Sequence, residues 1–441
     1  MRSGLALALI LGIASQAKAT SLLIKNAHVV DPAAATVSLK NILIRDGRTA
    51  EILNAGSAPS AEDVFDAKKL WLIPGLTDMH THSWGNDAPF EEFETIGPEN
   101  TAKRMLYSGV TSFLDLGSPE DVIFPARERL RKGETQGAEL LAAGSVFVSG
   151  KASRDGKAHV VNTQKEARAE VDKLASRKPD VVKVIFDYRR KSGMKREVMA
   201  AIVRQAKKHG LPAVVHIGSW LNAKHAAEAG AGAFTHLNED EVVPDDVVKA
   251  LKASGIRAIP TMAVQLETLN ISESPGLLKA PLLVDVTSKE LRSAYARIKE
   301  DPEMEYQIRW QKDGRINDKK SFEKLRAAGI PLLAGSDAAN YGSFQGYSLH
   351  RELVLFTENG ASRWEALRAA TTEPDAFFKR VPPLAPGGWA NFVLLKRNPA
   401  DDITATQEIA EVFYRGRKLD RPALLKSSFN RSGIEPASSG K

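Results

Sequence analysis

Short apolar runs alternate with longer amphipathic stretches through the middle of this chain. The runs cover residues 72–79, 110–115, 139–145, 181–186, 212–216, 232–236, 256–260 and 331–336. Each has the length of a buried strand, and the stretches between them are long enough for helices. Eight strand–helix units in succession predict an α/β fold, a TIM-like (β/α)8 barrel, over residues 74–386.

Both ends of the chain show a different pattern, in which short β-rich runs are separated by turn signals. These runs are residues 22–24, 28–30, 41–44, 389–395 and 411–414. We therefore expect residues 20–73 and 387–426 to combine into one small β-sandwich that flanks the barrel.

Two further segments interrupt this plan. Residues 262–325 separate the seventh predicted strand from the helix before the eighth, which is long for a connection. Because insertions in barrel loops often cover the site, we interpret this segment either as a lid or as a solvated helical excursion. Residues 427–441 are polar and contain Gly and Pro, so we expect a disordered tail.

The first 19 residues have the order of features that a secretory signal peptide requires. Arg2 precedes the apolar stretch Leu5–Ala14, and Ala17-Lys18-Ala19 has the small-x-small form of a cleavage site. The apolar stretch is shorter than the roughly 20 residues that cross a bilayer. The sequence predicts export to the bacterial periplasm or beyond, without a membrane anchor.

Composition limits the kinds of partner and of site. The net charge of +7 is spread along the chain without basic blocks or interleaved aromatic residues, so we expect no nucleic-acid binding. The chain has no cysteine, and any metal site must therefore use His, carboxylate or a modified lysine. The expected partner is a small-molecule substrate, and assembly into a homo-oligomer stays open.

Lys183 is the most unusual polar position, because it lies inside the apolar run Val181–Phe186. A lone ammonium is costly to bury, so either the strand faces water or another group compensates the charge. If the amine reacts with carbon dioxide, it becomes an anionic carbamate that can bridge two divalent ions.

Five further candidate ligands follow apolar runs. His80 and His82 are two residues apart, hence on the same side of an extended segment, while His216, His236 and Asp337 each close a predicted strand. Since the carboxyl ends of barrel strands form the active-site face, these side chains and Lys183 are expected to meet in one two-metal hydrolase centre.

Weaker candidates for substrate contact lie in two predicted loops. His159 follows the third strand, and Tyr188 and Arg189 follow the strand of Lys183. A guanidinium there can hold a substrate carboxylate, although a solvated charge run explains it equally well. Gly144–Ala152 lacks the spacing of a phosphate loop, and neither a GxSxG nor an HExxH motif occurs, which leaves serine-hydrolase and thermolysin-like mechanisms unsupported.

Taken together, four motifs resemble the amidohydrolase superfamily, in its binuclear branch with a carboxylated lysine on strand four, which includes prolidase-like and imidazolonepropionase-like enzymes. The motifs are Ile73–His82, Gly335-Ser336-Asp337, Leu349–Leu353 and Ala366–Thr371. One departure is Ala390-Asn391-Phe392-Val393, where relatives usually have Ala-Asp-Leu-Val. It falls in the predicted sandwich and puts little doubt on the chemistry.

The resemblance implies a role for each of the six residues. His80, His82 and Asp337 would bind one ion, His216 and His236 a second, and carboxylated Lys183 would bridge both; zinc is the expected metal. Asp337 would also move a proton from the attacking water to the leaving nitrogen of an amide. The substrate expected is a dipeptide, an N-acyl amino acid or a cyclic amide.

Other functions stay open on the same fold. A mononuclear deaminase of this fold tends to have Glu three residues after the strand-five His, where this chain has Ser219, and lacks the lysine. A lactonase, a phosphotriesterase and a non-catalytic scaffold are the remaining alternatives.

Overall fold

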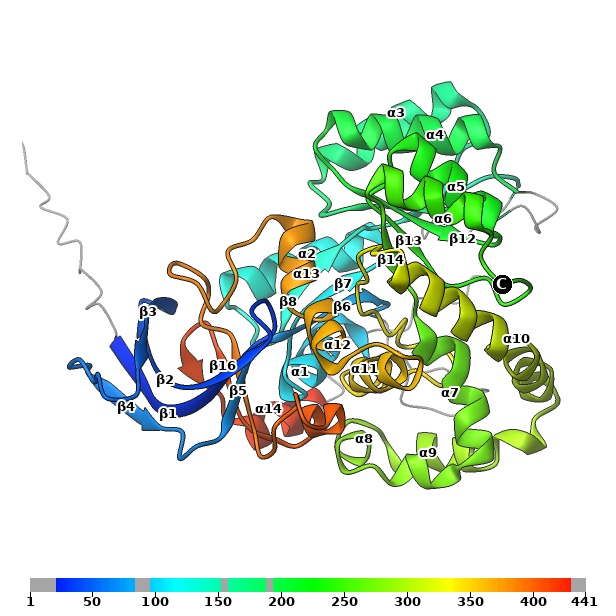
Figure 1. Ribbon diagram of the computed structural model, residues 1–441. Coiled ribbons are helices and arrows are strands. Elements are labelled where there is room, and N and C mark those ends of the chain that lie inside the picture. Colours follow the sequence, from blue (N-terminus) through cyan, green and yellow to red (C-terminus); the bar gives the residue numbers. More distant parts are fainter. Residues whose placement is uncertain (1–20, 84–95, 152–157, 188–192, 430–441) are drawn as a thin grey trace, which may run out of the picture.

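Strands and helices alternate through most of the chain in an α/β fold (Figure 1). This computed structural model describes residues 21–83, 96–151, 158–187 and 193–429. The described strands form sheets of eight, six and three strands. The predicted signal peptide lies outside the described residues and stays a prediction. Of the tail predicted over residues 427–441, the part from residue 430 onward also lies outside them, whereas Ser427 and Ser428 belong to a helix and are not disordered.

Two of the sheets are parallel, and they contain the second to seventh predicted apolar runs together with residues 76–79 of the first. One has the order β6-β7-β8 and the other β10-β9-β11-β12-β13-β14. Their strands are β6 (Leu76–Thr81), β7 (Val110–Asp115), β8 (Glu139–Ala142), β9 (Val146–Val148), β10 (Ala158–Val160), β11 (Val182–Phe186), β12 (Ala213–Ile217), β13 (Ala233–Thr235) and β14 (Arg257–Ile259).

The eighth predicted run, residues 331–336, is part of the segment 331–338, which lies between β14 and β6. On one side, the amide of Ala258 donates to the carbonyl of Pro331 at 3.0 Å. On the other side, the amide of Met79 donates to Ala334 at 2.9 Å, and that of Asp337 donates to His80 at 2.7 Å. This segment therefore joins the first strand of one parallel sheet to the last strand of the other.

Amphipathic helices follow the parallel strands and cover their outer side (Figure 1). In α4, the buried residues Val198, Ile202 and Ala206 recur at helical spacing. These helices are α1 (Gly97–Tyr107), α2 (Glu120–Lys132), α3 (Gln164–Ser176), α4 (Arg196–Lys208), α5 (Trp220–Ala229), α6 (Asp245–Ser254), α11 (Ser348–Glu358), α12 (Arg363–Ala369) and α13 (Thr372–Phe378).

Residues 262–325 are almost entirely helical. They form α7 (Met262–Glu273), η1 (Pro275–Lys279), α8 (Pro281–Val286), α9 (Lys289–Ala296), η2 (Ile298–Glu300) and α10 (Pro302–Ala327). Within the described ranges, no helix combines the length and the apolar character needed to cross a bilayer.

The third sheet combines the two ends of the chain. Its order is β17-β16-β15-β5-β1-β2-β3, with β4 also paired to β1. Its strands are β1 (Ser21–Asp31), β2 (Thr36–Arg45), β3 (Arg48–Asn54), β4 (Asp63–Asp66), β5 (Trp71–Pro74), β15 (Phe392–Leu395), β16 (Ile409–Tyr414) and β17 (Arg417–Lys418). The 3-10 helix η3 (Ile403–Gln407) and α14 (Arg421–Ser428) complete the C-terminal part.

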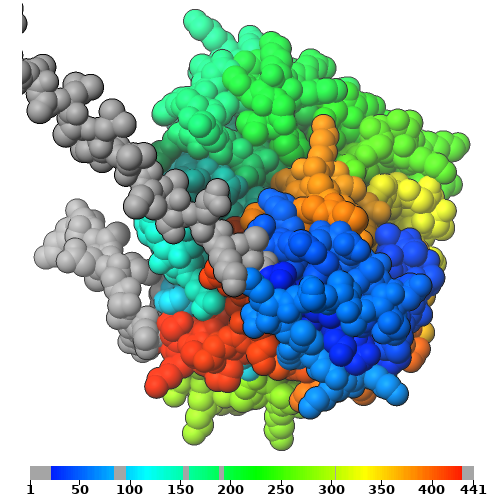
Figure 2. Space-filling view, turned by 90° about the vertical axis from the view of Figure 1, so that its left-hand side faces the viewer, coloured from blue at the N-terminus to red at the C-terminus, as the bar shows by residue number. Residues whose placement is uncertain are grey.

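A small core of its own holds this third sheet together. Ile24, Ile42, Leu72, Phe392 and Phe413 are all buried in one apolar cluster, although they come from both ends of the chain. Figure 2 shows the blue N-terminal strands beside the red C-terminal segment on one face of the molecule. Only Gly75 separates β5 from β6, so this sheet continues directly into the strand that carries His80.

Candidate metal centre

The six residues predicted as metal ligands line one cavity of about 540 Å³. His80, Lys183 and His216 lie within β6, β11 and β12, while His82, His236 and Asp337 lie just beyond strand ends or in the segment 331–338. The cavity therefore sits where the carboxyl ends of the parallel strands meet, as parallel βα units require.

Asp337 is the central carboxylate of this group and is 6% exposed. Its Oδ1 lies 3.3 Å from His80 Nε2 and 3.1 Å from His82 Nε2. Asn340 Nδ2 donates to the same Oδ1 at 2.8 Å, and Oδ2 lies 4.0 Å from His236 Nδ1. Burial disfavours a proton on His82, but the Asp337 carboxylate outweighs it and raises the pKa of His82.

Lys183 points into the same buried group and is 3% exposed. Its Nζ lies 3.5 Å from His80 Nε2 and donates to Thr235 Oγ1 at 3.2 Å. Among the described residues, no carboxylate lies within 4 Å of this nitrogen to form an ion pair, and burial lowers the pKa of Lys183 to about 7. Burial and the nearby lysine together hold the pKa of His80 well below its ordinary value.

The rings of His216 and His236 lie together on the other side of the cavity. Their centroids are 4.5 Å apart, and the centroid of His236 is 5.2 Å from that of His80. His236 Nδ1 lies 2.7 Å from the hydroxyl of Thr261, which itself donates to the carbonyl of Pro260 at 2.7 Å.

Thr261 is held by the beginning of α7, whose first amides are capped by a buried carboxylate. Glu352 accepts hydrogen bonds from the amides of Met262 at 3.1 Å and Ala263 at 2.7 Å. Four orphan amides at a helix start favour an anion at this place. Glu352 thus fixes the residue that contacts His236.

Asp78 ties the strand of His80 to the segment of Asp337. Its carboxylate accepts from the amide of Ser336 at 2.9 Å, from the hydroxyl of Ser336 at 2.6 Å and from the amide of His80 at 3.2 Å. Gly335 lies at the same junction, where an added Cβ would be 2.6 Å from Ile259 and 2.9 Å from His80. The two ligand-bearing segments can approach this closely only because residue 335 has no side chain.

The donor set fits a divalent cation. His80, His236 and Asp337 each offer a ligand atom, and these atoms lie within 4.8 Å of one another. His80 Nδ1 is buried and has no hydrogen-bond partner within the part of the chain that the structure describes. Clustered imidazoles with a carboxylate are the ligands that zinc and related ions prefer in a site without thiolates.

The weaker sequence candidates do not join this group. His159 lies on β10 outside the cavity lining, and its ring stacks on Phe147. Its Nε2 lies 2.8 Å from Glu120 and its Nδ1 lies 3.1 Å from Glu170, so the structure places it between two carboxylates of neighbouring helices. Tyr188 and Arg189 lie outside the described residues.

Much of the remaining wall was not predicted from the sequence. Besides apolar strand ends, it contains Glu239, Gln265, Gln307, Trp310, Asn340 and Tyr341. Gln307 and Trp310 belong to the helical segment 262–325, which was interpreted either as a lid or as a solvated helical excursion. No signal in the sequence selects these two residues.

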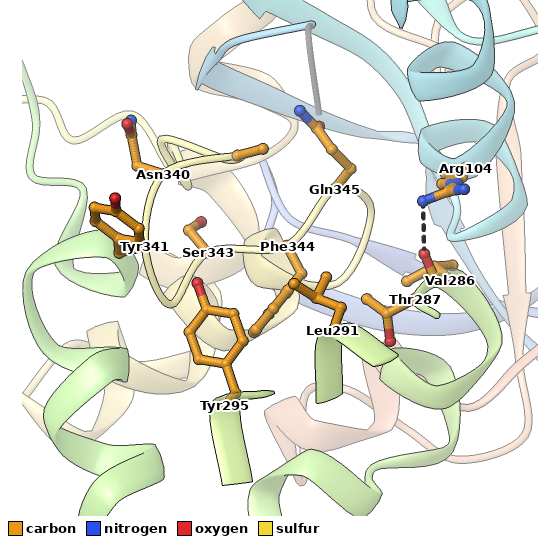
Figure 3. Close-up of a pocket in the computed structure, with 11 residues that line it drawn as sticks. Arg104, Val286, Thr287, Leu291, Tyr295, Asn340, Tyr341, Ser343, Phe344 and Gln345 are labelled. Atoms are coloured by element: carbon orange, nitrogen blue, oxygen red, sulfur yellow. Dashed lines mark hydrogen bonds between the residues drawn. The ribbon is translucent and has the colours of Figure 1, made fainter. Parts of the chain in front are cut away.

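A second cavity, of about 250 Å³, adjoins the first and shares Asn340 and Tyr341 with it (Figure 3). Its floor is formed by Leu291, Tyr295 and Phe344, and the amide of Gly342 donates to the Tyr295 hydroxyl at 2.8 Å. The loop that follows Asp337 therefore separates two hollows.

Comparison with known proteins places this geometry in a family. The model of the amidohydrolase family matches residues 71–419. Dihydroorotase from Elusimicrobium minutum (strain Pei191) is 50% identical over 60 residues, which is 14% of this chain and 14% of that enzyme. Dihydroorotase from Solibacter usitatus (strain Ellin6076) is 38% identical over 91 residues, 21% of this chain and 20% of that enzyme. The chain thus matches only a small part of these curated relatives.

Solved structures resemble the fold over most of its length. A Xaa-Pro dipeptidase with bound methionine has a TM-score of 0.73 at 20% identity, covering 91% of this chain and 100% of its own. Molinate hydrolase has a TM-score of 0.72 at 17% identity, covering 95% of this chain and 99% of its own. At this level of identity the likeness concerns the fold.

Proposed function

This chain belongs to the amidohydrolase family, and from that premise we propose that it is a metal-dependent hydrolase that cleaves a carbon–nitrogen amide bond of a small substrate. One observation carries the proposal: four imidazoles, the carboxylate of Asp337 and one buried lysine, brought together from five segments of the chain, line a single cavity. The names of the similar proteins, dihydroorotase and a dipeptidase, support the same bond type.

In this proposal His80, His82 and Asp337 would hold one divalent ion, and His216 and His236 would hold a second. Lys183 would contribute as an N6-carboxylated side chain shared between them, since an unmodified amine carries no negative charge to balance two cations. Zinc is the metal proposed, because the donors are mainly imidazole.

When bound, such ions supply Lewis-acid activation of water and of the scissile carbonyl. The chain itself supplies proton transfer. Oδ1 of Asp337 faces His80, His82 and Asn340, whereas the contact of its Oδ2 with His236 is longer, at 4.0 Å. We assign proton acceptance to Oδ2, which then passes the proton to the leaving nitrogen, because an amine anion is a poor leaving group.

The proposal extends to architecture and location. The parallel strands and residues 331–338 would form a closed (β/α)8 barrel over residues 74–386, and the curled terminal sheet, from residues 20–73 and 387–426, would be the flanking sandwich. Backbone hydrogen bonds on both edges of residues 331–338 support closure. Residues 1–19 would direct export and be removed.

A mononuclear deaminase is less well supported. Ser219, three residues after His216, accepts a hydrogen bond from the amide of Asn222 and caps α5, so it serves the helix start. Lys183 in the cavity also distinguishes this site from a one-metal site.

The test is a metal-loaded screen of the purified protein against dipeptides, N-acyl amino acids, cyclic imides, lactones and phosphotriesters. We expect amide hydrolysis that disappears after chelation and returns with zinc and bicarbonate, with about two ions per chain. The proposal would be overturned if the protein is purified without metal and still cleaves none of these compounds after zinc and bicarbonate are supplied. If the protein cleaves lactones or phosphotriesters but no amide, it is a hydrolase of a different reaction class from the one proposed.

A further inference from the structure

One wall of the metal cavity comes from the helical segment 262–325. Val264 and Gln265 of α7 and Gln307 and Trp310 of α10 line it. Gln307 and Trp310 are three residues apart in one helix, and side chains at this spacing lie on the same face. A single face of α10 therefore borders the space in which a substrate must lie.

This face is fixed relative to the rest of the site. Gln311 is 1% exposed, accepts a hydrogen bond from the amide of Leu269 at 2.8 Å and donates to the carbonyl of Val264 at 3.1 Å, which fastens α10 to α7. Further along α10, Asn317 donates to the carbonyl of Glu239 at 2.8 Å. Since Glu239 follows His236 closely in sequence, α10 is tied to a segment that carries a proposed ligand.

Aliphatic side chains from other parts of the fold contribute to the same lining. They are Leu116, Val146, Ile185, Ile217 and Leu237. A cavity lined by an indole and by aliphatic side chains favours a flat or branched apolar group. The carboxamide of Gln307 adds both a hydrogen-bond donor and an acceptor at its edge.

We propose that Trp310 and Gln307 form the specificity face of this site, and that the substrate carries a bulky apolar group, aryl or branched alkyl, beside the amide that is cleaved. This inference rests on the proposed function and narrows its substrate class. Trp310 packs against the apolar group, and Gln307 donates to or accepts from an uncharged polar atom of the same substrate.

The kinetic test compares amides that differ in one substituent, methyl against phenyl, on the acyl side in one pair and on the amine side in another. In at least one pair, Trp310→Ala should lower kcat/KM for the phenyl compound about 10- to 100-fold, while the methyl compound changes less than about threefold. Gln307→Ala should lower kcat/KM for both members. Tyr306→Ala, on the same helix but 67% exposed, is the matched control and should change neither.

Trp310→Phe is a second test that applies even if Trp310→Ala does not fold. This variant should retain most of the preference for the phenyl over the methyl compound in kcat/KM. Equal losses for methyl and phenyl compounds in Trp310→Ala, or no loss for either, would overturn the inference.

A binding experiment separates this inference from the proposed function. Calorimetry of the zinc-loaded protein with benzohydroxamic and acetohydroxamic acid needs no turnover. We expect tighter binding of benzohydroxamic acid, lost in Trp310→Ala. That result would support the specificity face even if no amide were hydrolysed, whereas equal affinities in the wild type would contradict it. No binding of either acid would instead overturn the proposed metal site, on which the inference rests.

Discussion

The hydroxyl oxygen of Thr261 lies within hydrogen-bond distance of Nδ1 of His236. The two atoms are 2.7 Å apart, and the hydroxyl proton is already donated to the carbonyl of Pro260. A hydroxyl whose proton is engaged can only accept from the ring, so Nδ1 of His236 carries the proton and Nε2 keeps its lone pair. Partners of this kind orient metal-binding imidazoles and set their tautomer.

Replacing Thr261 by Val should therefore weaken metal binding about 10- to 100-fold, because the shape is kept and the acceptor is lost. Titration of the metal-free protein with zinc, followed by calorimetry, measures this. Thr261→Ser keeps the hydroxyl and should bind zinc as the wild type does. Equal zinc affinity in the Val variant and the wild type would show that the hydroxyl does not orient His236.

Lys183→Ala should abolish activity and lower the metal content from near two ions per chain, because the proposed bridge is removed. Acetate added at millimolar concentration should partly restore both, since a free carboxylate fits the vacated place. Metal analysis by mass spectrometry and a rate assay check this. The bridging role would be wrong if the alanine variant kept normal turnover and metal content.

Gly335→Ala should disturb the junction of the two ligand-bearing segments. The new Cβ would lie 2.6 Å from Ile259 and 2.9 Å from His80, so strands must move apart. Overpacking of this kind costs roughly 1–3 kcal/mol of unfolding free energy, and zinc affinity should fall with it. Gly56→Ala is the control, because nothing lies within 4 Å of the added carbon. Denaturant unfolding of both variants gives the comparison, and equal stabilities would argue against a tight junction.

Asp375 gives a pH dependence of stability that does not involve the metal site. Burial raises the pKa of Asp375 from 3.8 to about 6, although Arg380 lies 3.2 Å away. The folded protein thus holds this proton more tightly than the unfolded chain, so the group's contribution to unfolding free energy falls as pH rises from about 4 to 6.

Asp375→Asn removes this titration. The unfolding free energy of the variant minus that of the wild type should increase as the pH rises from about 4 to 6, and it should stay constant above about pH 6. Urea unfolding at several pH values measures the difference. A difference independent of pH would show that Asp375 titrates alike in both states.

The sequence predicted a common location for those side chains that can bind a metal and that also stand at the end of an apolar run. His216 and Asp337 each end an apolar run, and parallel strands bring such ends together, so a common location followed from order alone. His159 also lies near a strand, but its surroundings depend on Glu120 and Glu170 from two helices, which no local pattern reveals.

The cavity wall was unpredictable for a related reason. Trp310 faces the site because Gln311 fastens α10 to α7 through Leu269 and Val264, residues about 40 positions earlier in the chain. Thr261 likewise acquires its role only through contact with a different strand end. Such contacts are properties of the tertiary fold, and helical periodicity in residues 262–325 predicts none of them.

Because β5 lies inside the third sheet, that sheet can form completely only after strands from both parts of the chain have been synthesised. β5 lies between β1 and β15, and it continues through Gly75 into the strand that carries His80. On a ribosome, residues 392–395 emerge long after residues 71–74, so β5 lacks its second neighbour while the whole intervening segment is synthesised. The strand that carries His80 would thus be anchored on both sides of β5 only after residue 395 has emerged, and a chain interrupted before residue 392 would leave an open sheet edge beside it.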